Sequence, residues 1–244
     1  MKTTGADAEH RKYWWRFANV RLELRARAAT MRRFLATARV SKRPVFAFMD
    51  SSWTPSEQVV VFPLPTGTAF AVLQSRVHYV WLTFQASHMG EAMRYSATDC
   101  FASFPFPTRD PAGCLEPLEG LGERLHEARA QTARTRETGL TQTYNAMLDP
   151  DCDEPDIVVL RAQHEALDRA VLDAYGWQDV AVPPYVVSER TTPEAYGAFE
   201  DAVAERLYRL NAERAASEPT PHGGPSKSAR RPRNAPEPRA SRKR

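Results

Sequence analysis

A proline-rich stretch near the middle of the chain sets the strongest limit on its fold. Residues 101–107 read Phe-Ala-Ser-Phe-Pro-Phe-Pro, and two prolines so close together are incompatible with a helix, so we expect extended backbone. Phe104 and Phe106 then become candidate anchors in a core. A linker rich in proline and glycine follows over residues 108–119. The chain is therefore predicted to change its type of secondary structure at this point.

The part before the break combines helical and strand patterns. Residues 21–35 are rich in Arg, Ala and Leu and contain no breaker, which favours a helix. Residues 75–85 repeat apolar side chains with helical spacing behind Ser75, a candidate cap. Between them lie three β-type runs, separated by turn signals, at 45–49, 58–62 and 68–73. We predict an α+β fold, in which a small mixed or antiparallel sheet carries packed helices.

The part after the break is helical. A helix is expected at 118–136, and residues 157–174 carry an apolar stripe that Pro155 opens and Gly176 ends. The pattern Thr-Thr-Pro-Glu at 191–194 is typical of a capping box and opens a last helix. We therefore expect a disordered N-terminus at 1–12, an α+β domain at 13–110, a small helical module at 111–215 and a disordered basic tail at 216–244.

The charges are distributed unevenly along the 244 residues. Residues 1–43 carry 12 Lys and Arg against 3 Asp and Glu, and residues 216–244 carry 8 against 2. Because the formal net charge is only +3, residues 44–215 are left with −12. Basic ends around an acidic middle indicate a polyanionic partner for the ends, although a solvated helix face and a solubilising tail account for the composition equally well.

Signals for export or membrane insertion are missing from the sequence. No apolar stretch is long enough to span a bilayer, and residues 1–10 lack the order of an export signal. The three cysteines, Cys100, Cys114 and Cys152, are odd in number and far apart, which argues against a disulfide framework or a zinc ribbon. We therefore expect a cytoplasmic protein without membrane contact.

Motifs for enzymatic chemistry are weak. The glycines form neither a G-x-G-x-x-G nor a Walker A pattern, so no nucleotide cofactor has a cradle. Residues 182–185, Val-Pro-Pro-Tyr, resemble the Asn/Asp-Pro-Pro-Tyr loop of amino-methyltransferases, but Val182 replaces the polar residue and an extended linker is the favoured interpretation. His164 begins a zinc-helix pattern in which Asp168 stands for the second histidine, and its place on the apolar stripe favours a core histidine.

Basic and aromatic side chains offer a surface for nucleic acid. They interleave over residues 13–17, where Trp14 and Trp15 are also good candidates for core anchors. Arg and Lys neutralise phosphates or read guanine edges, whereas Ser and Tyr hydroxyls position the backbone. The contacts expected first are Arg39, Lys42, Arg43, Arg94 and Tyr95, and the second choices are Arg16 and Arg76. The basic tail is expected to add affinity that does not depend on DNA sequence.

Ordered sequence blocks resemble a known family. They are Tyr-Trp-Trp-Arg at 13–16, Ala-Arg-Val-Ser-Lys at 38–42, residues 70–78, Arg-Tyr-Ser at 94–96, residues 100–107, residues 139–145, residues 164–177 and residues 207–214. Together they are similar to the C-terminal half of the adenine-specific DNA methyltransferases of type IIG restriction-modification and related phage-defence systems, including the MmeI-type enzymes. The resemblance covers about residues 10–215.

The resemblance implies that residues 10–110 are a target recognition domain that binds double-stranded DNA, braced by the later helices. The family's S-adenosylmethionine loop and Asn-Pro-Pro-Tyr loop belong upstream, and this chain starts at Met1 without them. We therefore expect no cofactor in this chain and no methylation by it alone, with S-adenosylmethionine on the missing catalytic part. The chain is then either a separately encoded specificity part, which has a separate methyltransferase or nuclease subunit as a partner, or the remnant of a split or truncated gene. The alternative is an interaction scaffold that docks on such a subunit and has no DNA affinity of its own.

Overall fold

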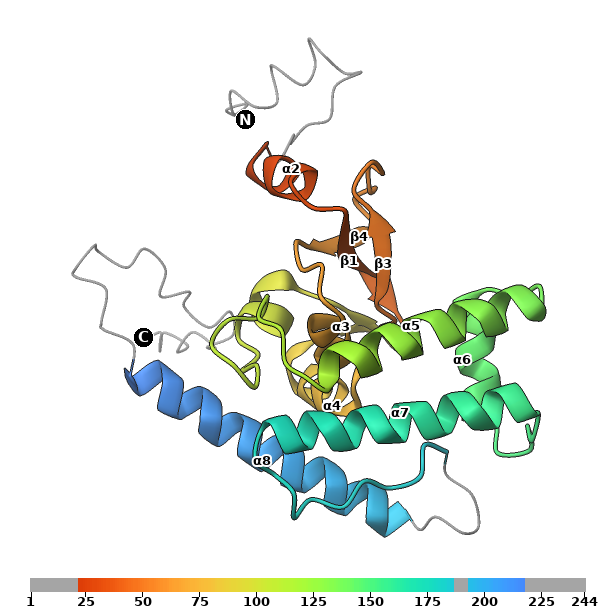
Figure 1. The fold of residues 1–244 in the computed structure, drawn as a ribbon. Helices are drawn as coiled ribbons and strands as arrows, with labels where there is room; N and C mark the ends of the chain where they lie inside the picture. Colours follow the sequence, from red (N-terminus) through yellow and green to blue (C-terminus); the bar gives the residue numbers. More distant parts are fainter. Residues whose placement is uncertain (1–21, 187–192, 218–244) are drawn as a thin grey trace, which may run out of the picture.

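The computed structural model describes residues 22–186 and 193–217, which form a sheet-containing part joined to a layer of helices (Figure 1). The first part contains α2 (Leu22–Ala29), β1 (Arg33–Ala38), β2 (Val40–Ser41), β3 (Ala47–Asp50), β4 (Val59–Phe62), α3 (Gly67–Gln74), α4 (Arg76–Gln85), β5 (Ser87–Met89), β6 (Ala92–Arg94) and the π-helical turn η1 (Ala97–Ala102). The helices that follow are α5 (Leu118–Thr135), α6 (Leu140–Leu148), α7 (Pro155–Ala174) and α8 (Pro193–Ser217). None of these helices is long and apolar enough to cross a membrane.

Two small antiparallel sheets confirm the predicted α+β class. The first has the strand order β3-β1-β4, with Leu35 of β1 opposite Phe48 on one side and Phe62 on the other. The second has the order β2-β6-β5. Because β1 is central, four of its six side chains are buried, and it organises the core of this part.

The predicted helix over residues 21–35 is wrong at its C-terminal end. The helix α2 stops at Ala29, and Arg33 begins the central strand β1. Arg, Leu and Ala favour a helix only weakly. The strand is more stable here, because β1 pairs on both edges and buries Phe34 and Leu35. The strands expected at 45–49 and 58–62 are confirmed as β3 and β4.

The strand predicted at residues 68–73 is also wrong, because these residues form α3. Every residue from Gly67 to Leu73 is buried. The segment therefore has no polar face, and without one the sequence does not show the spacing of apolar residues that is typical of a helix. Thr66 caps the helix by accepting a hydrogen bond from the N–H of Ala69 at 3.2 Å. The helix predicted at 75–85 is confirmed as α4, with Ser75 as its cap.

The backbones of α3 and α5 lie in direct contact. A Cβ atom added to Gly122 would lie 2.0 Å from the carbonyl oxygen of Gly67, and one added to Gly67 would lie 2.4 Å from the carbonyl oxygen of Glu119. The carboxylate of Glu119 accepts hydrogen bonds from the N–H groups of Gly67 and Thr68 at 2.9 and 2.8 Å. Glycine at both positions therefore brings the start of α5 against the start of α3.

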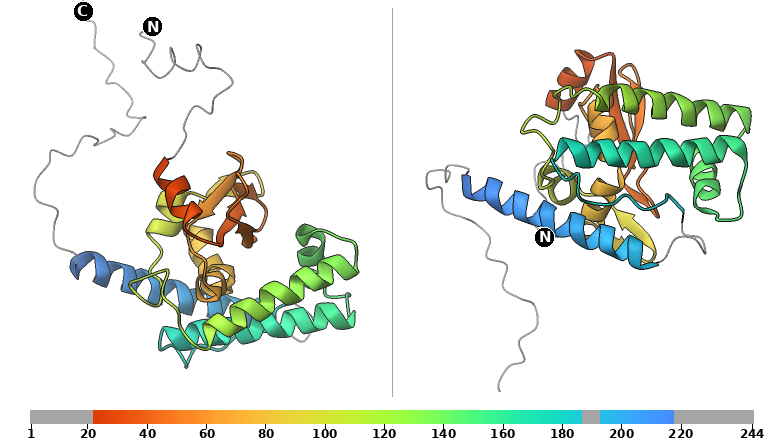
Figure 2. Two further views of the ribbon diagram at one scale, coloured as in Figure 1. Left: turned by 45° about the horizontal axis from the view of Figure 1, so that its top comes forward. Right: turned by 60° about the horizontal axis from the view of Figure 1, so that its bottom comes forward.

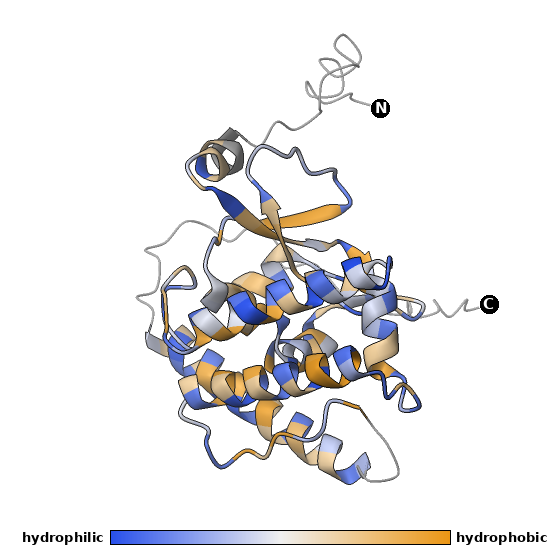
Figure 3. Cartoon of the chain, turned by 45° about the vertical axis from the view of Figure 1, so that its right-hand side comes forward, coloured by the Kyte–Doolittle hydropathy of each residue, from blue (hydrophilic) through white to orange (hydrophobic). Residues whose placement is uncertain are grey.

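The helical layer covers the sheet-containing part from one side. Helices α5 and α7 run side by side with α6 at one end, and α8 crosses against α4 (Figures 1 and 2). Hydrophilic and hydrophobic residues alternate along α5 and α7 (Figure 3), as expected for helices with one buried face. Residues that precede position 110 in the sequence and residues that follow it belong to the same buried core. Examples are Leu35 and Phe70 before this position and Leu167 and Leu207 after it.

The proline-rich stretch anchors this core as predicted. Phe104 and Phe106 are 4% and 5% exposed, and their rings pack edge to face with centroids 5.0 Å apart. Tyr175, which follows α7, donates a hydrogen bond to the carbonyl of Pro105 at 2.8 Å. The predicted extended region is shorter than expected at its start, because residues 101 and 102 complete the turn η1.

Two buried histidines make the stability of the fold depend on pH. Burial lowers the pKa of His78 and of His164 to about 3, from 6.5. The unfolded state therefore binds more protons as the pH falls below about 6.5. The contribution of the two neutral imidazoles to the free energy of unfolding is fully present above about pH 6.5. It is lost as the pH falls toward 3. Between about pH 7 and pH 5 we expect the free energy of unfolding to decrease by about 2 kcal/mol per histidine, measured by urea titration at both pH values.

Substitution of one histidine provides the control for this pH dependence. His164 is 1% exposed, and its Nε2 lies 3.2 Å from the hydroxyl of Tyr144, which confirms the predicted core histidine. The variant His164→Gln should lose about 2 kcal/mol of the pH-dependent decrease, which is the contribution of one buried histidine. A stability that is the same at both pH values would contradict the assignment of neutral, buried imidazoles.

Candidate nucleic-acid interface

Arg39 lies where the two sheets meet. Its backbone N–H donates to the carbonyl of Gln58 at 2.7 Å, and its own carbonyl accepts from the N–H of Tyr95 at 2.8 Å. Its Nε donates to the carbonyl of Glu57 at 2.7 Å, beside the start of β4. These three hydrogen bonds hold a partly exposed guanidinium at the junction of the sheets.

Arg94 stands in the middle of an exposed row across the second sheet. It pairs with Val40 of β2 on one side and with Ser87 of β5 on the other. Directly paired residues share one face of a sheet, and all three are exposed. Within residues 22–186 and 193–217, no hydrogen bond or ion pair engages the guanidinium of Arg94. This face therefore offers a free cation at its centre.

Lys42 and Arg43 extend the basic surface beyond β2. The Nζ atom of Lys42 lies 2.6 Å from Oε2 of Glu91, and the two side chains are 78% and 81% exposed. A pair so exposed contributes little to stability and separates readily when a competing anion approaches. Arg43 is half-buried, and its Cζ lies 5.1 Å from the centroid of the Tyr79 ring.

The hairpin of β5 and β6 forms two of the three strands of this face and is not predicted from the sequence. Its turn contains Gly90, whose φ of 62° is in the left-handed region that favours glycine. Met89, beside the turn, is 61% exposed. The two strands have three residues each, which is too short for an alternating pattern to be recognised, and Gly90 is the sole local signal.

Tyr95 is buried, although it directly follows β6. Its side chain is 1% exposed, and its hydroxyl lies 3.1 Å from Nε2 of His78. Its ring packs edge to face against Phe46 and Phe62. Burial raises the pKa of Tyr95 well above 10. The backbone of Tyr95 bonds to Arg39, but its side chain does not lie on the surface where the sequence analysis places a DNA contact.

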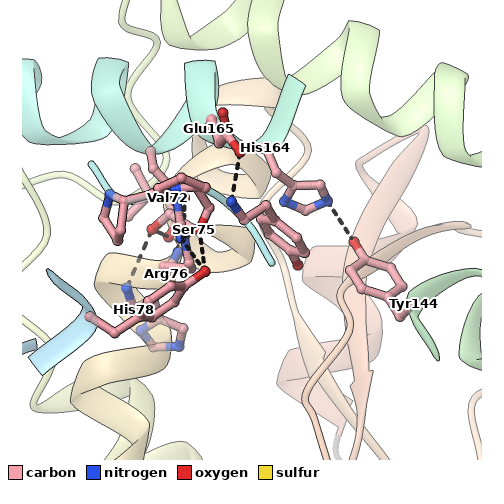
Figure 4. A network of polar contacts seen from close by, with 12 residues as sticks. Val72, Ser75, Arg76, His78, Tyr144, His164 and Glu165 are labelled. Carbon is pink, nitrogen blue, oxygen red and sulfur yellow. Dashed lines mark hydrogen bonds and ion pairs between the residues drawn. The ribbon is translucent and has the colours of Figure 1, made fainter. Parts of the chain in front are cut away.

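Arg76 is likewise committed inside the fold, at the start of α4. Its Nε lies 2.5 Å from Oδ2 of Asp168, and its backbone N–H donates to Oδ1 of the same carboxylate at 2.8 Å (Figure 4). Its Nη2 and Nη1 donate to the carbonyls of Pro183 and Pro184 at 2.8 and 3.1 Å. The guanidinium thus joins α4 to α7 and to the segment before α8, with 12% of the side chain exposed.

The segment containing Val182, Pro183, Pro184 and Tyr185 is the extended linker that the sequence predicts. It lies between α7 and α8 without helix or strand, and its two proline carbonyls accept from Arg76. The N–H of Tyr185 donates to Oε1 of Glu165 at 2.6 Å. The residues therefore serve to fasten the linker to α4 and α7.

The exposed residues of the second sheet fit a polyanion. Arg39, Lys42 and Arg94 carry charges able to neutralise phosphates, and arginine reads a guanine edge with two parallel hydrogen bonds. The carboxylate of Glu91 and the backbone carbonyl of Glu57 border the same region. In the described part of the chain, no group of three or more His, Cys, Asp or Glu side chains is placed to hold a metal ion. Arg16 and its aromatic neighbours lie outside the described residues.

Comparisons with known proteins confirm the resemblance seen in the sequence. The chain matches the structure of the Type IIL restriction-modification enzyme MmeI in complex with DNA, with a TM-score of 0.56 and 17% sequence identity. The match covers 88% of this chain and 25% of that chain, so the protein spans a quarter of the length of that structure's chain. No curated protein matches it. Residues 15–108 match the family described as MmeI, target recognition domain, and this part of the chain is therefore similar to that domain.

Proposed function

We propose that this protein recognises a specific sequence in double-stranded DNA as the specificity part of an adenine-specific restriction-modification system. The observation that carries the proposal is the match of residues 15–108 to the MmeI target recognition domain, combined with the exposed row on the second sheet that has Arg94 at its centre. The surface used is the outer face of β2, β6 and β5 together with Arg39 and Lys42. Arg43 lies at the border of this face.

Within the proposal, different roles fall to the three basic side chains of this surface, those of Lys42, Arg94 and Arg39. Lys42 sits on a flexible, largely exposed side chain whose only described partner is Glu91, which suits a phosphate contact. Arg94 is fixed in a strand between two paired neighbours, which suits the reading of a base edge. Arg39 is anchored at the junction of the sheets and positions the DNA backbone. The basic tail adds affinity that is independent of sequence.

We also propose that methyl transfer takes place outside this chain. The sequence contains neither a glycine-rich nucleotide loop nor an Asn-Pro-Pro-Tyr loop, and the one similar segment has Val182 in place of the polar residue. The carbonyls of Pro183 and Pro184 are moreover occupied by Arg76. S-adenosylmethionine then belongs to a catalytic part outside these 244 residues, for which a methyltransferase or nuclease subunit is one form.

Binding-site selection from a random duplex pool tests DNA recognition. At about 0.15 M salt, where purely electrostatic binding is much weakened, we expect the full-length protein to enrich one motif. Lys42→Gln should weaken binding to all sequences alike and reduce the salt slope by about one. Arg94→Gln should instead relax the preference at one position of the motif, at a cost of about 1–3 kcal/mol for the preferred base pair.

Arg124→Gln is the matched control for these variants, because Arg124 is an exposed arginine on α5, outside the second sheet. Its motif and salt slope should equal those of the unmodified protein. Retention on DNA without an enriched motif would contradict independent recognition. Absence of retention, together with a stable complex with a methyltransferase subunit, would favour the interaction scaffold instead.

A further inference from the structure

A hollow of about 330 Å³ lies between α4, the linker before α8 and α8 itself. Four aromatic rings contribute to its lining, from Tyr79, Tyr185, Tyr196 and Phe199. Two guanidinium groups, those of Arg43 and Arg76, also line it. A smaller void of about 20 Å³, large enough for about one water molecule, continues inward beside the same two arginines. The hollow is separate from the outer face of the second sheet.

The two arginines differ in how their charges are balanced. Arg76 is paired with the buried carboxylate of Asp168, and its Cζ lies 5.3 Å from the centroid of the Tyr185 ring. Arg43 rests over the ring of Tyr79, and within the described residues its guanidinium has neither a hydrogen bond nor an ion pair. The remaining charged group of the lining is Glu200, which is exposed. Among the described residues, Arg43 is therefore the arginine of the lining that has no carboxylate partner.

We propose that this hollow binds an unpaired nucleotide, with the base against Tyr79 and Tyr196, the two partly exposed rings of the lining, and the phosphate on Arg43. Aromatic side chains and guanidinium planes are the groups on which proteins stack unpaired bases, and stacking tolerates every base because each has a π-face. A guanidinium with free donors binds a phosphate through charge-assisted hydrogen bonds. A volume of this size lies at the small end of ligand pockets, which measure about 300–1,000 Å³.

The position of the hollow allows two sources of the nucleotide. Arg43 directly follows Lys42 in the chain, so a strand held at Lys42 passes close to the opening of the hollow. The nucleotide can then be an unpaired one within a DNA strand. The same chemistry is offered by a free mononucleotide. Because the free nucleotide needs no duplex, the proposal can be tested independently of sequence recognition by the second sheet.

Fluorescence of an aminopurine nucleotide, which is quenched when its ring stacks, provides the test on the full-length protein. The probes are the deoxynucleoside monophosphate, the nucleoside without phosphate, a single strand carrying the analogue, and a duplex carrying it unpaired. We expect quenching by the unmodified protein, with binding of the monophosphate at least about tenfold tighter than that of the nucleoside. Quenching of the monophosphate identifies a free nucleotide as ligand, and quenching confined to the strand or duplex identifies an unpaired nucleotide within DNA.

Three variants decide whether the hollow is responsible. Arg43→Gln should weaken binding of whichever probe is quenched about tenfold, and Glu200→Gln should strengthen it about twofold by removing a like charge. Arg124→Gln removes the same charge on α5, outside the lining of the hollow, and should leave the affinity for every probe unchanged, which excludes a general effect of positive charge. Thermal unfolding confirms that each variant is folded. Absence of quenching with every probe, or equal affinities for Arg43→Gln and the unmodified protein, would overturn the proposal, whereas motif enrichment by the second sheet would be unaffected.

Discussion

Asp168→Ala is expected to lower the free energy of unfolding by about 3–5 kcal/mol, measured by urea denaturation. Asp168 is fully buried, and its two oxygens accept from the backbone N–H and from the Nε of Arg76. Burial raises the pKa of Asp168, and the guanidinium of Arg76 opposes that shift. Without the carboxylate, an arginine that is 12% exposed keeps its charge but loses its counterion.

Two further variants separate the ion pair from other effects at this position. Glu91→Ala removes the partner of Lys42 in a largely exposed pair and should cause no measurable loss. The double variant Arg76→Met with Asp168→Leu should lose less stability than Asp168→Ala alone, because no charge is then left without a partner. If the single and the double variant were equally destabilised, the loss would come from packing and not from the unpaired charge.

Gly122→Ala is expected to lower the free energy of unfolding by about 3 kcal/mol, at the upper end of the range for overpacked cores. The added Cβ would lie 2.0 Å from the carbonyl oxygen of Gly67, and the backbone there cannot move aside as a flexible side chain would. Helices α3 and α5 must therefore separate, which also stretches the hydrogen bonds from Gly67 and Thr68 to Glu119. Thermal or urea denaturation measures the change.

Gly197→Ala is the control for the glycine substitution. Gly197 is also helical, in α8, but nothing lies within 4 Å of the position of an added Cβ. Alanine there should stabilise the protein by about 0.5–1 kcal/mol, because glycine is a poor helix former. A loss of stability in both variants would show that the backbone contact of α3 and α5 is not the cause.

Local signals allowed several elements to be predicted correctly. The helix α4 has a capping serine and a regular apolar face, and α7 has Pro155 in its first turn and Gly176, with a φ of 77°, just beyond its end. His164 was correctly interpreted as a core residue because it lies on the apolar stripe of α7. By contrast, α3 has no exposed face, and β1 is a strand because of its neighbours on both edges.

The candidate site was harder to predict, since an arginine in a sequence does not show whether it is exposed. The partner of Arg76, Asp168, is 92 residues away, and no local pattern links the two. Tyr95 lies next to the exposed Arg94, but alternation along the strand turns its ring inward. The exposed positions of Arg39, Lys42 and Arg94 agree with a surface role, and their contacts with DNA stay a prediction.

The continuous core determines which segment can be exchanged between related proteins. Phe70 and Leu73 of α3 share that core with Leu125 of α5 and Leu167 of α7. A chimera joined at residue 110 would pack the two sheets of one protein against the helices of another, whose buried side chains fit a different core. The close contact of Gly67 in α3 with Gly122 in α5 would then be formed by residues from two different proteins. The smallest graft that keeps its own interior runs from β1 through α8. Under the proposed function, new specificities are therefore better sought by changing exposed side chains on β2, β5 and β6 than by transplanting the sheets.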